Sequence, residues 1–284
     1  MIQPPRIFNL HQQKAGGKTI ESALQRRLGG SVARVSKVFP DVSVGDISKY
    51  LDATRAQPDA IGTNVKVVTG HFFYGLHKSS DVQFTYTTVI REPVSRLKSY
   101  FNYVMNGEED YFLRQYFVKN EIGFEQFVRL GDGIEPPDCP SELAIIADNG
   151  QSRLLHGTPA PLGHKMTQAE FDVVQTHLED DFALVAPTDR VSEFVVLLFG
   201  LIGEAPPAFL PKVNTQETDW VGTIPYGTRA YIRARHHHDV ALYDYASKRF
   251  AAQETGWTSR AGAALIDFAG RMYTNYWQPR KQRK

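Results

Sequence analysis

Two short stretches combine cations and hydroxyls, in the first case with two glycines, in an order that suits the binding of a phosphate or sulfate group. In the first, an apolar run over residues 6–10 leads through Gly16 and Gly17 into a helical pattern over residues 19–28. A helix that begins after such a turn directs its N–H groups and its positive end at an anion. We expect both glycines to turn the chain with positive φ and to let the anion approach the backbone closely. Two cations and a hydroxyl donor belong to the same stretch: Lys14, Lys18 and Thr19.

The second stretch places an arginine where a strand-like run ends. Residues 84–90 are apolar and β-branched, Arg91 follows them, and Pro93 stands where proline often opens a helix. An arginine in this position can hold a phosphate with two hydrogen bonds, and Ser99, in the second turn of the helix, adds a hydroxyl donor. The alternative interpretation is an ordinary strand-to-helix turn.

The elements that must position these residues alternate between strand and helix. Strands are expected over residues 6–10, 31–36, 65–69, 84–90 and 182–186. Helices are expected over residues 19–28, 44–51, 93–104, 109–130, 141–155, 167–178, 191–202, 227–250 and 259–276. This alternation predicts an α/β fold with a mainly parallel sheet and helices on both faces, and such sheets bind ligands at the carboxyl ends of their strands. Because Lys14, His71 and Arg91 each follow a predicted strand directly, we expect them to share one site.

Both stretches resemble the nucleotide-binding motifs of carbohydrate-type sulfotransferases, which use 3′-phosphoadenosine 5′-phosphosulfate. Residues 11–19 are similar to the 5′-phosphosulfate loop His-x-Pro-Lys-[Thr/Ala]-Gly-Gly-Thr-[Thr/Ser], with Gln13 replacing the proline and Lys18 a threonine. Residues 87–100 are similar to the 3′-phosphate motif Val-[Ile/Leu]-Arg-[Asp/Glu]-Pro-x-x-Arg-x-x-Ser-x-Tyr. Further segments resemble the second sulfotransferase family, which includes uronyl 2-O-sulfotransferases: residues 68–77, 148–157, 182–194, 214 and 239–246. The membrane anchor and lumenal cysteines of Golgi members are missing, so a Golgi role is not implied.

The resemblance implies a single sulfotransferase domain over residues 1–284, with a P-loop-like sheet and helical additions in the middle and C-terminal parts. Its expected parts are a cofactor-binding core over residues 1–105 and 180–215, an acceptor-side helical region over 106–180, C-terminal helices over 227–276 and a basic tail over 279–284. The implied reaction transfers a sulfuryl group to a hydroxyl, or less readily an amine, of a carbohydrate or other small metabolite, without a metal.

The resemblance also implies roles for individual residues. Lys14 would neutralise the bridging oxygen, and Gly16, Gly17, Lys18 and Thr19 would hold the 5′-phosphosulfate. Arg91 and Ser99 would hold the 3′-phosphate, and Lys212 and Asn214 would close over the nucleotide. His71 is the expected general base, because its ordinary pKa suits proton transfer near neutral pH; His77, His11 and His156 are alternatives. His77, Asn149 and Arg153 would line the acceptor cleft, although Asn149 and Arg153 also suit a helix surface.

Two other functions fit parts of the pattern. Gly17, Lys18 and Thr19 match the end of a Walker A loop, which would suit a small-molecule kinase that uses ATP and Mg²⁺. The first glycine of that loop would fall at position 12, which is Gln12, and no apolar strand ends in a clear Mg²⁺-binding aspartate. The other alternative is a nucleotide-binding protein without catalytic activity.

Metal and thiol chemistry are poorly supported. The run of His236, His237, His238 and Asp239 invites a metal-binding interpretation, but adjacent residues of a helix point in different directions. We therefore expect a solvated helix start there. Cys139 lies among prolines and has no obvious activating partner.

The whole chain of 284 residues carries 32 lysines and arginines against 31 aspartates and glutamates. The resulting net charge of +1 gives no general attraction to nucleic acid or to a membrane. One cysteine excludes an intrachain disulfide, no apolar run reaches the roughly 18 residues that span a membrane, and the first residues show no signal pattern. These features predict a cytoplasmic protein.

Overall fold

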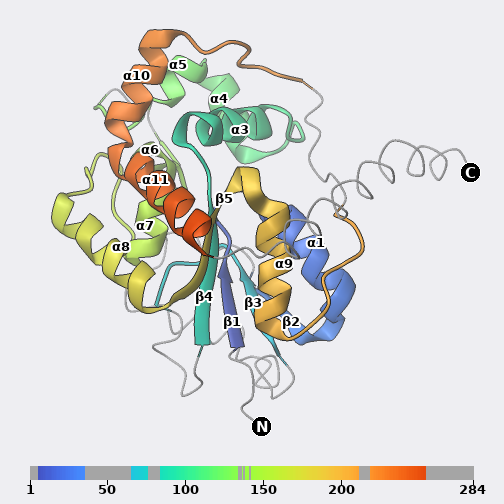
Figure 1. Cartoon of the computed structure of the whole chain (residues 1–284). Helices are drawn as coiled ribbons and strands as arrows, with labels where there is room; N and C mark the ends of the chain where they lie inside the picture. Colours follow the sequence, from blue (N-terminus) through green and yellow to red (C-terminus); the bar gives the residue numbers. More distant parts are fainter. Residues whose placement is uncertain are drawn as a thin grey trace, which may run out of the picture.

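A five-stranded sheet forms the centre of the molecule (Figure 1). The computed structural model describes residues 6–35, 65–75, 84–133, 136, 138–140, 142–210 and 218–253. The strands are β1 (Arg6–Leu10), β2 (Val32–Val35), β3 (Val67–Gly70), β4 (Phe84–Ile90) and β5 (Phe182–Pro187). Their order is β2-β3-β1-β4-β5, and each neighbouring pair is parallel. The predicted α/β class with a mainly parallel sheet is therefore confirmed.

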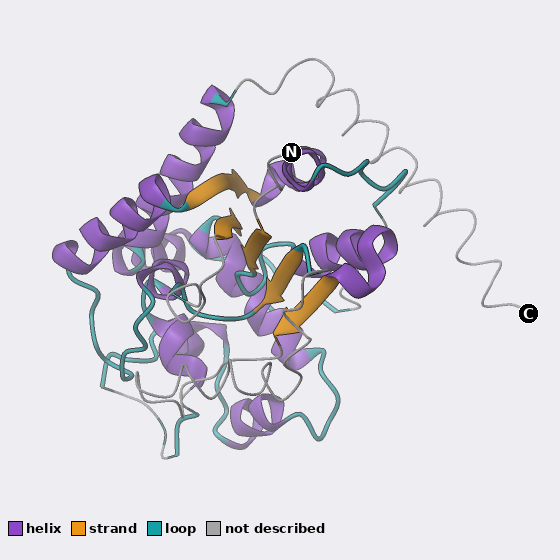
Figure 2. Ribbon diagram, turned by 90° about the horizontal axis from the view of Figure 1, so that it is seen from below, coloured by secondary structure: helices purple, strands orange, loops and turns teal. Residues whose placement is uncertain are grey.

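Alternating side chains of the strands build a core on each face of the sheet. Ile7 of β1 packs on the face covered by α1 (Gly17–Leu28) and α9 (Val191–Ile202). Phe8 packs on the opposite face, which is covered by the helices α7 (Gly150–His156), α8 (Gln168–Asp180) and α11 (His237–Ala252). Figure 2 shows the sheet between these two layers of helices. Both faces are buried, as is usual for parallel sheets.

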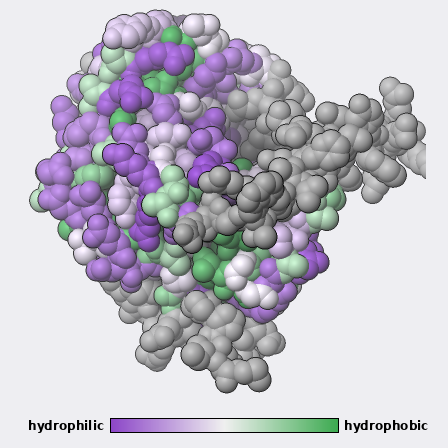
Figure 3. Space-filling view, in the orientation of Figure 1, coloured by the Kyte–Doolittle hydropathy of each residue, from purple (hydrophilic) through white to green (hydrophobic). Residues whose placement is uncertain are grey.

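A third core lies among helices at the carboxyl end of the sheet (Figure 1). It is built around aromatic residues such as Phe101, Phe117 and Phe127. The contributing helices are α3 (Pro93–Met105), α4 (Phe112–Lys119), α5 (Phe124–Phe127), α6 (Glu142–Ala147) and α10 (Tyr226–Arg235). On the outer side of α8, α10 and α11, Figure 3 shows mostly hydrophilic side chains, so these helices are amphipathic.

Three expected helices are each divided in two. The helix expected over residues 109–130 is replaced by α4 and α5, which Asn120 and Gly123 separate. Residues 141–155 form α6 and α7, because Asn149 adopts a left-handed conformation with φ of 44°. Residues 227–250 form α10 and α11, which meet at His236. The backbone N–H of Asn149 donates to Nδ1 of His236 at 3.1 Å, so these last two breaks contact each other. Short 3-10 turns cover Gly29–Ser31 and Thr188–Arg190.

Other expectations have mixed outcomes. The helix expected over residues 167–178 forms α8, which Thr167 and Glu170 cap in a full capping box. The expected helices over residues 44–51 and 259–276 and the basic tail over 279–284 lie outside the described residues. No helix in the described part of the chain is long and apolar enough to cross a membrane.

Candidate functional site

The strand order places a topological switch point between the carboxyl ends of β1 and β4. The chain leaves β1 toward β2 on one side of the sheet and leaves β4 toward β5 on the other. Parallel sheets bind ligands at such a switch point. Lys14 follows β1 and Arg91 follows β4, and Nη1 of Arg91 donates to the carbonyl oxygen of Lys14 at 2.8 Å. The structure thus brings together the two predicted anion-binding stretches.

The loop before α1 turns by left-handed conformations at Lys14 (φ 65°) and Gly16 (φ 87°). The positive φ predicted for Gly16 is confirmed, whereas that predicted for Gly17 is wrong, because Gly17 already belongs to α1. Gly17 is needed for a different reason: a Cβ at this position would fall within the ring of His11. The left-handed conformation of Lys14 has no signal in the sequence, since only glycine, asparagine and aspartate adopt it readily.

The first turn of α1 is open to an anion. Gly16 gives the helix no side-chain cap, and no acidic residue lies in the first turn. The N–H of Thr19 donates to the carbonyl of Gly16 at 3.0 Å. Within the described part of the chain, the N–H groups of Gly17 and Lys18 have no hydrogen-bond partner. These amides and the positive helix end are the groups that bind phosphate or sulfate in other helices.

Positive charge accumulates around this turn. Burial, together with the charges of Lys18 and Arg91, lowers the pKa of Lys14 to about 8. Burial also lowers the pKa of Arg91. Among the described residues, no carboxylate forms an ion pair with Lys14, Lys18 or Arg91. A bound anion would relieve the mutual repulsion of these three cations.

Tyr103 is an unpredicted member of the site. Nζ of Lys14 lies 4.2 Å and Nζ of Lys18 5.6 Å from the centre of its ring, within the range of cation–π attraction. Tyr103 is 37% exposed and lies on α3 four residues after Ser99, so the two share a helix face. That spacing is the only signal that could have identified it. Ser99 itself is half-buried.

The rings of two histidines pack against each other beside the loop. His71 follows β3, and its ring centre lies 4.1 Å from that of His11. Nδ1 of His71 lies 2.8 Å from the carbonyl oxygen of His11, so it must donate and leaves Nε2 as the basic nitrogen of the neutral ring. Burial and the nearby charges of His71 and Lys14 lower the pKa of His11 well below its usual value.

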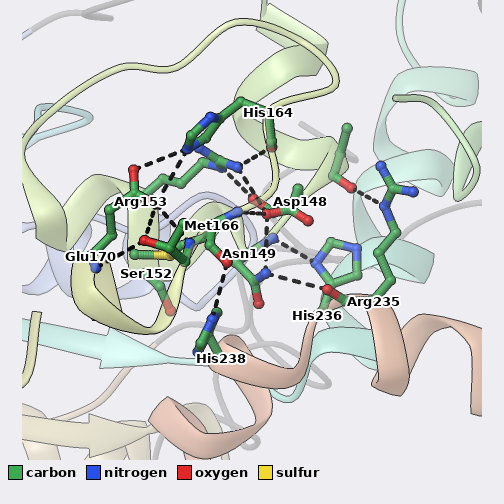
Figure 4. Close-up of polar contacts among 12 residues, drawn as sticks. Asp148, Asn149, Ser152, Arg153, His164, Met166, Glu170, Arg235, His236 and His238 are labelled. Atoms are coloured by element: carbon green, nitrogen blue, oxygen red, sulfur yellow. Dashed lines mark hydrogen bonds and ion pairs between the residues drawn. The ribbon is translucent and has the colours of Figure 1, made fainter. Parts of the chain in front are cut away.

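Asn149 and Arg153 are buried and bonded within the protein (Figure 4). The side-chain amide of Asn149 donates to Asp148 at 3.1 Å, and its oxygen accepts from the N–H of Asp239 at 3.1 Å. Arg153 donates to the carboxylate of Asp148 at 2.8 Å and to the carbonyl of His164. The alternative of a helix-surface role is therefore wrong for both, while a role in the acceptor cleft stays a prediction.

The expected solvated start of α11 is also wrong. His236, His238 and Asp239 are buried, and His237 alone of the four is exposed. The carboxylate of Asp239 accepts from the N–H groups of Gln151 at 3.1 Å and of Ser152 at 2.8 Å, so it caps the positive end of α7. In the described ranges, no group of three or more histidine, cysteine or acidic residues is arranged to hold a metal ion.

The remaining candidates have defined positions or fall outside the structure. His156 ends α7 and is half-buried, and burial lowers its pKa. Cys139 is half-buried against the helical core. His77, Lys212 and Asn214 lie outside the described residues.

No protein-family model matches the chain, and the search of curated proteins finds no significant match. The function is therefore inferred from the residues and their geometry.

Proposed function

We propose that this chain is a sulfotransferase that binds 3′-phosphoadenosine 5′-phosphosulfate between the loop before α1 and Arg91. Its acceptor would be a hydroxyl, or less readily an amine, of a carbohydrate or other small metabolite. The observation that carries the proposal is the meeting of two separate cationic elements at the switch point, where Arg91 donates to the carbonyl of Lys14. A nucleotide with phosphate groups on both its 5′ and 3′ positions has two anionic centres for these two elements.

The residues around α1 fit the 5′-phosphosulfate. The N–H groups of Gly17 and Lys18 point out of an uncapped helix end, and Lys14 lacks a carboxylate partner among the described residues. With a pKa of about 8, Lys14 is mostly protonated at neutral pH and can neutralise charge on a bridging oxygen. Thr19 adds a hydroxyl in the same turn.

Arg91 and Ser99 fit the 3′-phosphate. Arg91 is half-buried at the end of β4, where a charge-assisted hydrogen bond is stronger than in water. Ser99 lies on the face of α3 that also carries Tyr103. This pair would hold a second anionic group, for which a Walker-type loop alone has no site.

The nucleotide, when bound, supplies the sulfuryl group. His71 would accept the proton of the acceptor hydroxyl at Nε2, because its Nδ1 already donates to the carbonyl of His11. His11 packs against the His71 ring and supports its orientation. Lys14 would offset charge on the leaving side, so that positioning and electrostatic stabilisation supply most of the catalytic effect.

Calorimetric titration tests the nucleotide assignment directly. We expect the protein to bind adenosine 3′,5′-bisphosphate at micromolar concentrations without metal, and more tightly than AMP. Arg91→Ala should weaken bisphosphate binding by about tenfold or more, and by far more than it weakens AMP binding, because a charged hydrogen bond contributes about 1.5–3 kcal/mol. The matched control is Arg27→Ala, which removes the same charge at the exposed far end of α1.

The other outcomes identify the alternatives. Equal loss of affinity for both nucleotides in Arg91→Ala would overturn the 3′-phosphate assignment. Tight Mg²⁺-dependent binding of ATP without a response to the bisphosphate would indicate a kinase. Bisphosphate binding without sulfuryl transfer to any of a panel of hydroxylated acceptors would indicate a nucleotide-binding protein.

A further inference from the structure

Gln151 is a buried residue that contacts both anion-binding elements. Oε1 of Gln151 accepts from the backbone N–H of Arg91 at 2.8 Å, and its Nε2 donates to the carbonyl of Arg91 at 2.8 Å. Ile90 is the last residue of β4 paired with β5, so the ladder ends immediately before Arg91. The amide of Gln151 thus takes the place of a strand partner for the backbone of Arg91.

The same residue reaches the loop after β1. The carbonyl of Gln151 accepts from the side-chain amide of Gln12 at 3.2 Å. Gln12 precedes Lys14 by two residues, and its backbone carbonyl accepts from the N–H of Ala15 at 3.2 Å, which closes the turn. Gln151 therefore contacts both the loop that carries Lys14 and the residue that carries the candidate 3′-phosphate guanidinium.

Asp239 holds Gln151 in place from the opposite side. Its carboxylate accepts from the N–H of Gln151, and it lies 3.9 Å from Nη1 of Arg96. Nε of Arg96 donates in turn to the carbonyl of Gln13 at 3.1 Å. Gln151 and Asp239 are 0% exposed and Arg96 is 2% exposed, so these contacts form in a medium where they are strong and directional.

We propose that Gln151 is a positioning residue that orients Arg91 toward the 3′-phosphate and couples it to the glycine loop. This inference rests on the proposed function of the site. The guanidinium of Arg91 can grip a phosphate only if its backbone is fixed, because a small tilt at Cα moves the end of a long side chain by much more. Two hydrogen bonds from one rigid amide supply that fixation.

The test measures the ratio of the dissociation constants for AMP and adenosine 3′,5′-bisphosphate, which isolates the contribution of the 3′-phosphate. Gln151→Leu keeps the side-chain size and removes the amide; we expect the ratio to fall about tenfold, since two buried hydrogen bonds are lost. Thr87→Val is the matched control, because Thr87 is equally buried in β4 and donates to Asn9 rather than to Arg91. An unchanged ratio in folded Gln151→Leu protein would overturn the inference.

In a second variant, the pH decides whether the side chain at position 151 can donate a hydrogen bond. In Gln151→Glu, a protonated carboxyl supplies one donor and one acceptor, the two functions that the amide uses toward Arg91, whereas the carboxylate cannot donate to the carbonyl of Arg91. Relative to wild type at each pH, we expect the ratio of this variant to recover between pH 8 and pH 5.5. A purely structural role predicts no such recovery. The wild-type ratio separately tests the proposed function: a value of one there would refute 3′-phosphate recognition itself.

Discussion

The positive charge of Lys14 lies close to the positive charges of Lys18 and Arg91, which disfavour its protonated form. Its pKa of about 8 reflects burial and the charges of Lys18 and Arg91, and a bound phosphate would raise that pKa. Binding is therefore linked to protonation of Lys14. We expect full affinity for adenosine 3′,5′-bisphosphate below pH 8 and a decrease as the pH rises above 8, by at most about tenfold per pH unit for one proton. Titration calorimetry from pH 7 to 9.5 measures this dependence.

Lys14→Arg is the control for this pH effect. Arginine stays protonated throughout the range, so the affinity of this variant should be nearly independent of pH. The low pKa of His11 removes that histidine as a competing cause above pH 7. A decrease of the same size in Lys14→Arg and wild type would assign the titration to another group.

At the residue scale, sequence motifs predicted the charged groups of the site but not the residues that contact and position them. Lys14, Arg91 and His71 could be predicted because each follows a strand, and strand ends meet at one edge of a parallel sheet. Gln151 could not, because its contacts join residues that are far apart along the chain, and the single signal for Tyr103 was its spacing from Ser99. Asp239 was missed for a related reason: a carboxylate beside three histidines suggests solvent exposure, yet it caps another helix.

The start of α1 depends on a close contact that only glycine permits. The ring of His11 occupies the space where a Cβ of Gly17 would lie. Gly17→Ala should therefore destabilise the protein by about 1–3 kcal/mol, although alanine favours a helix more than glycine does. Urea denaturation measures the change. Gly30→Ala, at a glycine with open space around it, is the control and should be nearly neutral.

A double-mutant cycle identifies the cause of this cost. In the background of His11→Ala the obstructing ring is gone, so adding Gly17→Ala should destabilise the protein little further. Additive effects of the two substitutions would show that Gly17 is required for another reason.

At the element scale, periodicity predicted the strands and most helices, but not where long helical stretches break. β4 and α9 have the expected bounds, and α3 extends one residue further than expected. The break at Asn149 has a local signal that we did not use, because Gly150 follows Asn149 and Asn-Gly is a common turn pair, whereas the break at His236 has neither proline nor glycine beside it. Both breaks are stabilised by hydrogen bonds between residues 148–153 and 235–239, which exist only after the two segments pack together.

At the scale of the whole molecule, the parallel sheet followed from the alternation of strands and helices, and the switch point between β1 and β4 followed from the strand order. The packing of α11 against α7 could not be predicted from that alternation. It nevertheless affects how the stability of the protein depends on pH. His236, at the junction of α10 and α11, is buried, and its Nδ1 accepts from Asn149. The neutral ring therefore carries its proton on Nε2, which has no hydrogen-bond partner among the described residues.

Burial lowers the pKa of His236 to about 4; the nearby carboxylates of Asp239 and Asp148 oppose this shift, and Arg96 and Arg235 add to it. Because the unfolded chain binds this proton near pH 6.5, the free energy of unfolding should fall as the pH decreases from 6.5 to 4, by at most about 1.4 kcal/mol per pH unit from this group. Urea denaturation at pH 7, 6 and 5 measures the slope of the free energy of unfolding against pH.

His236→Asn is the control, because asparagine offers an acceptor in place of Nδ1 and does not titrate. The slope of this variant should be smaller by an amount that corresponds to at most one proton. His11, His156 and His238, whose pKa values are also lowered, continue to titrate in both proteins and cancel in the comparison. Equal slopes would mean that His236 does not account for the loss of stability in acid.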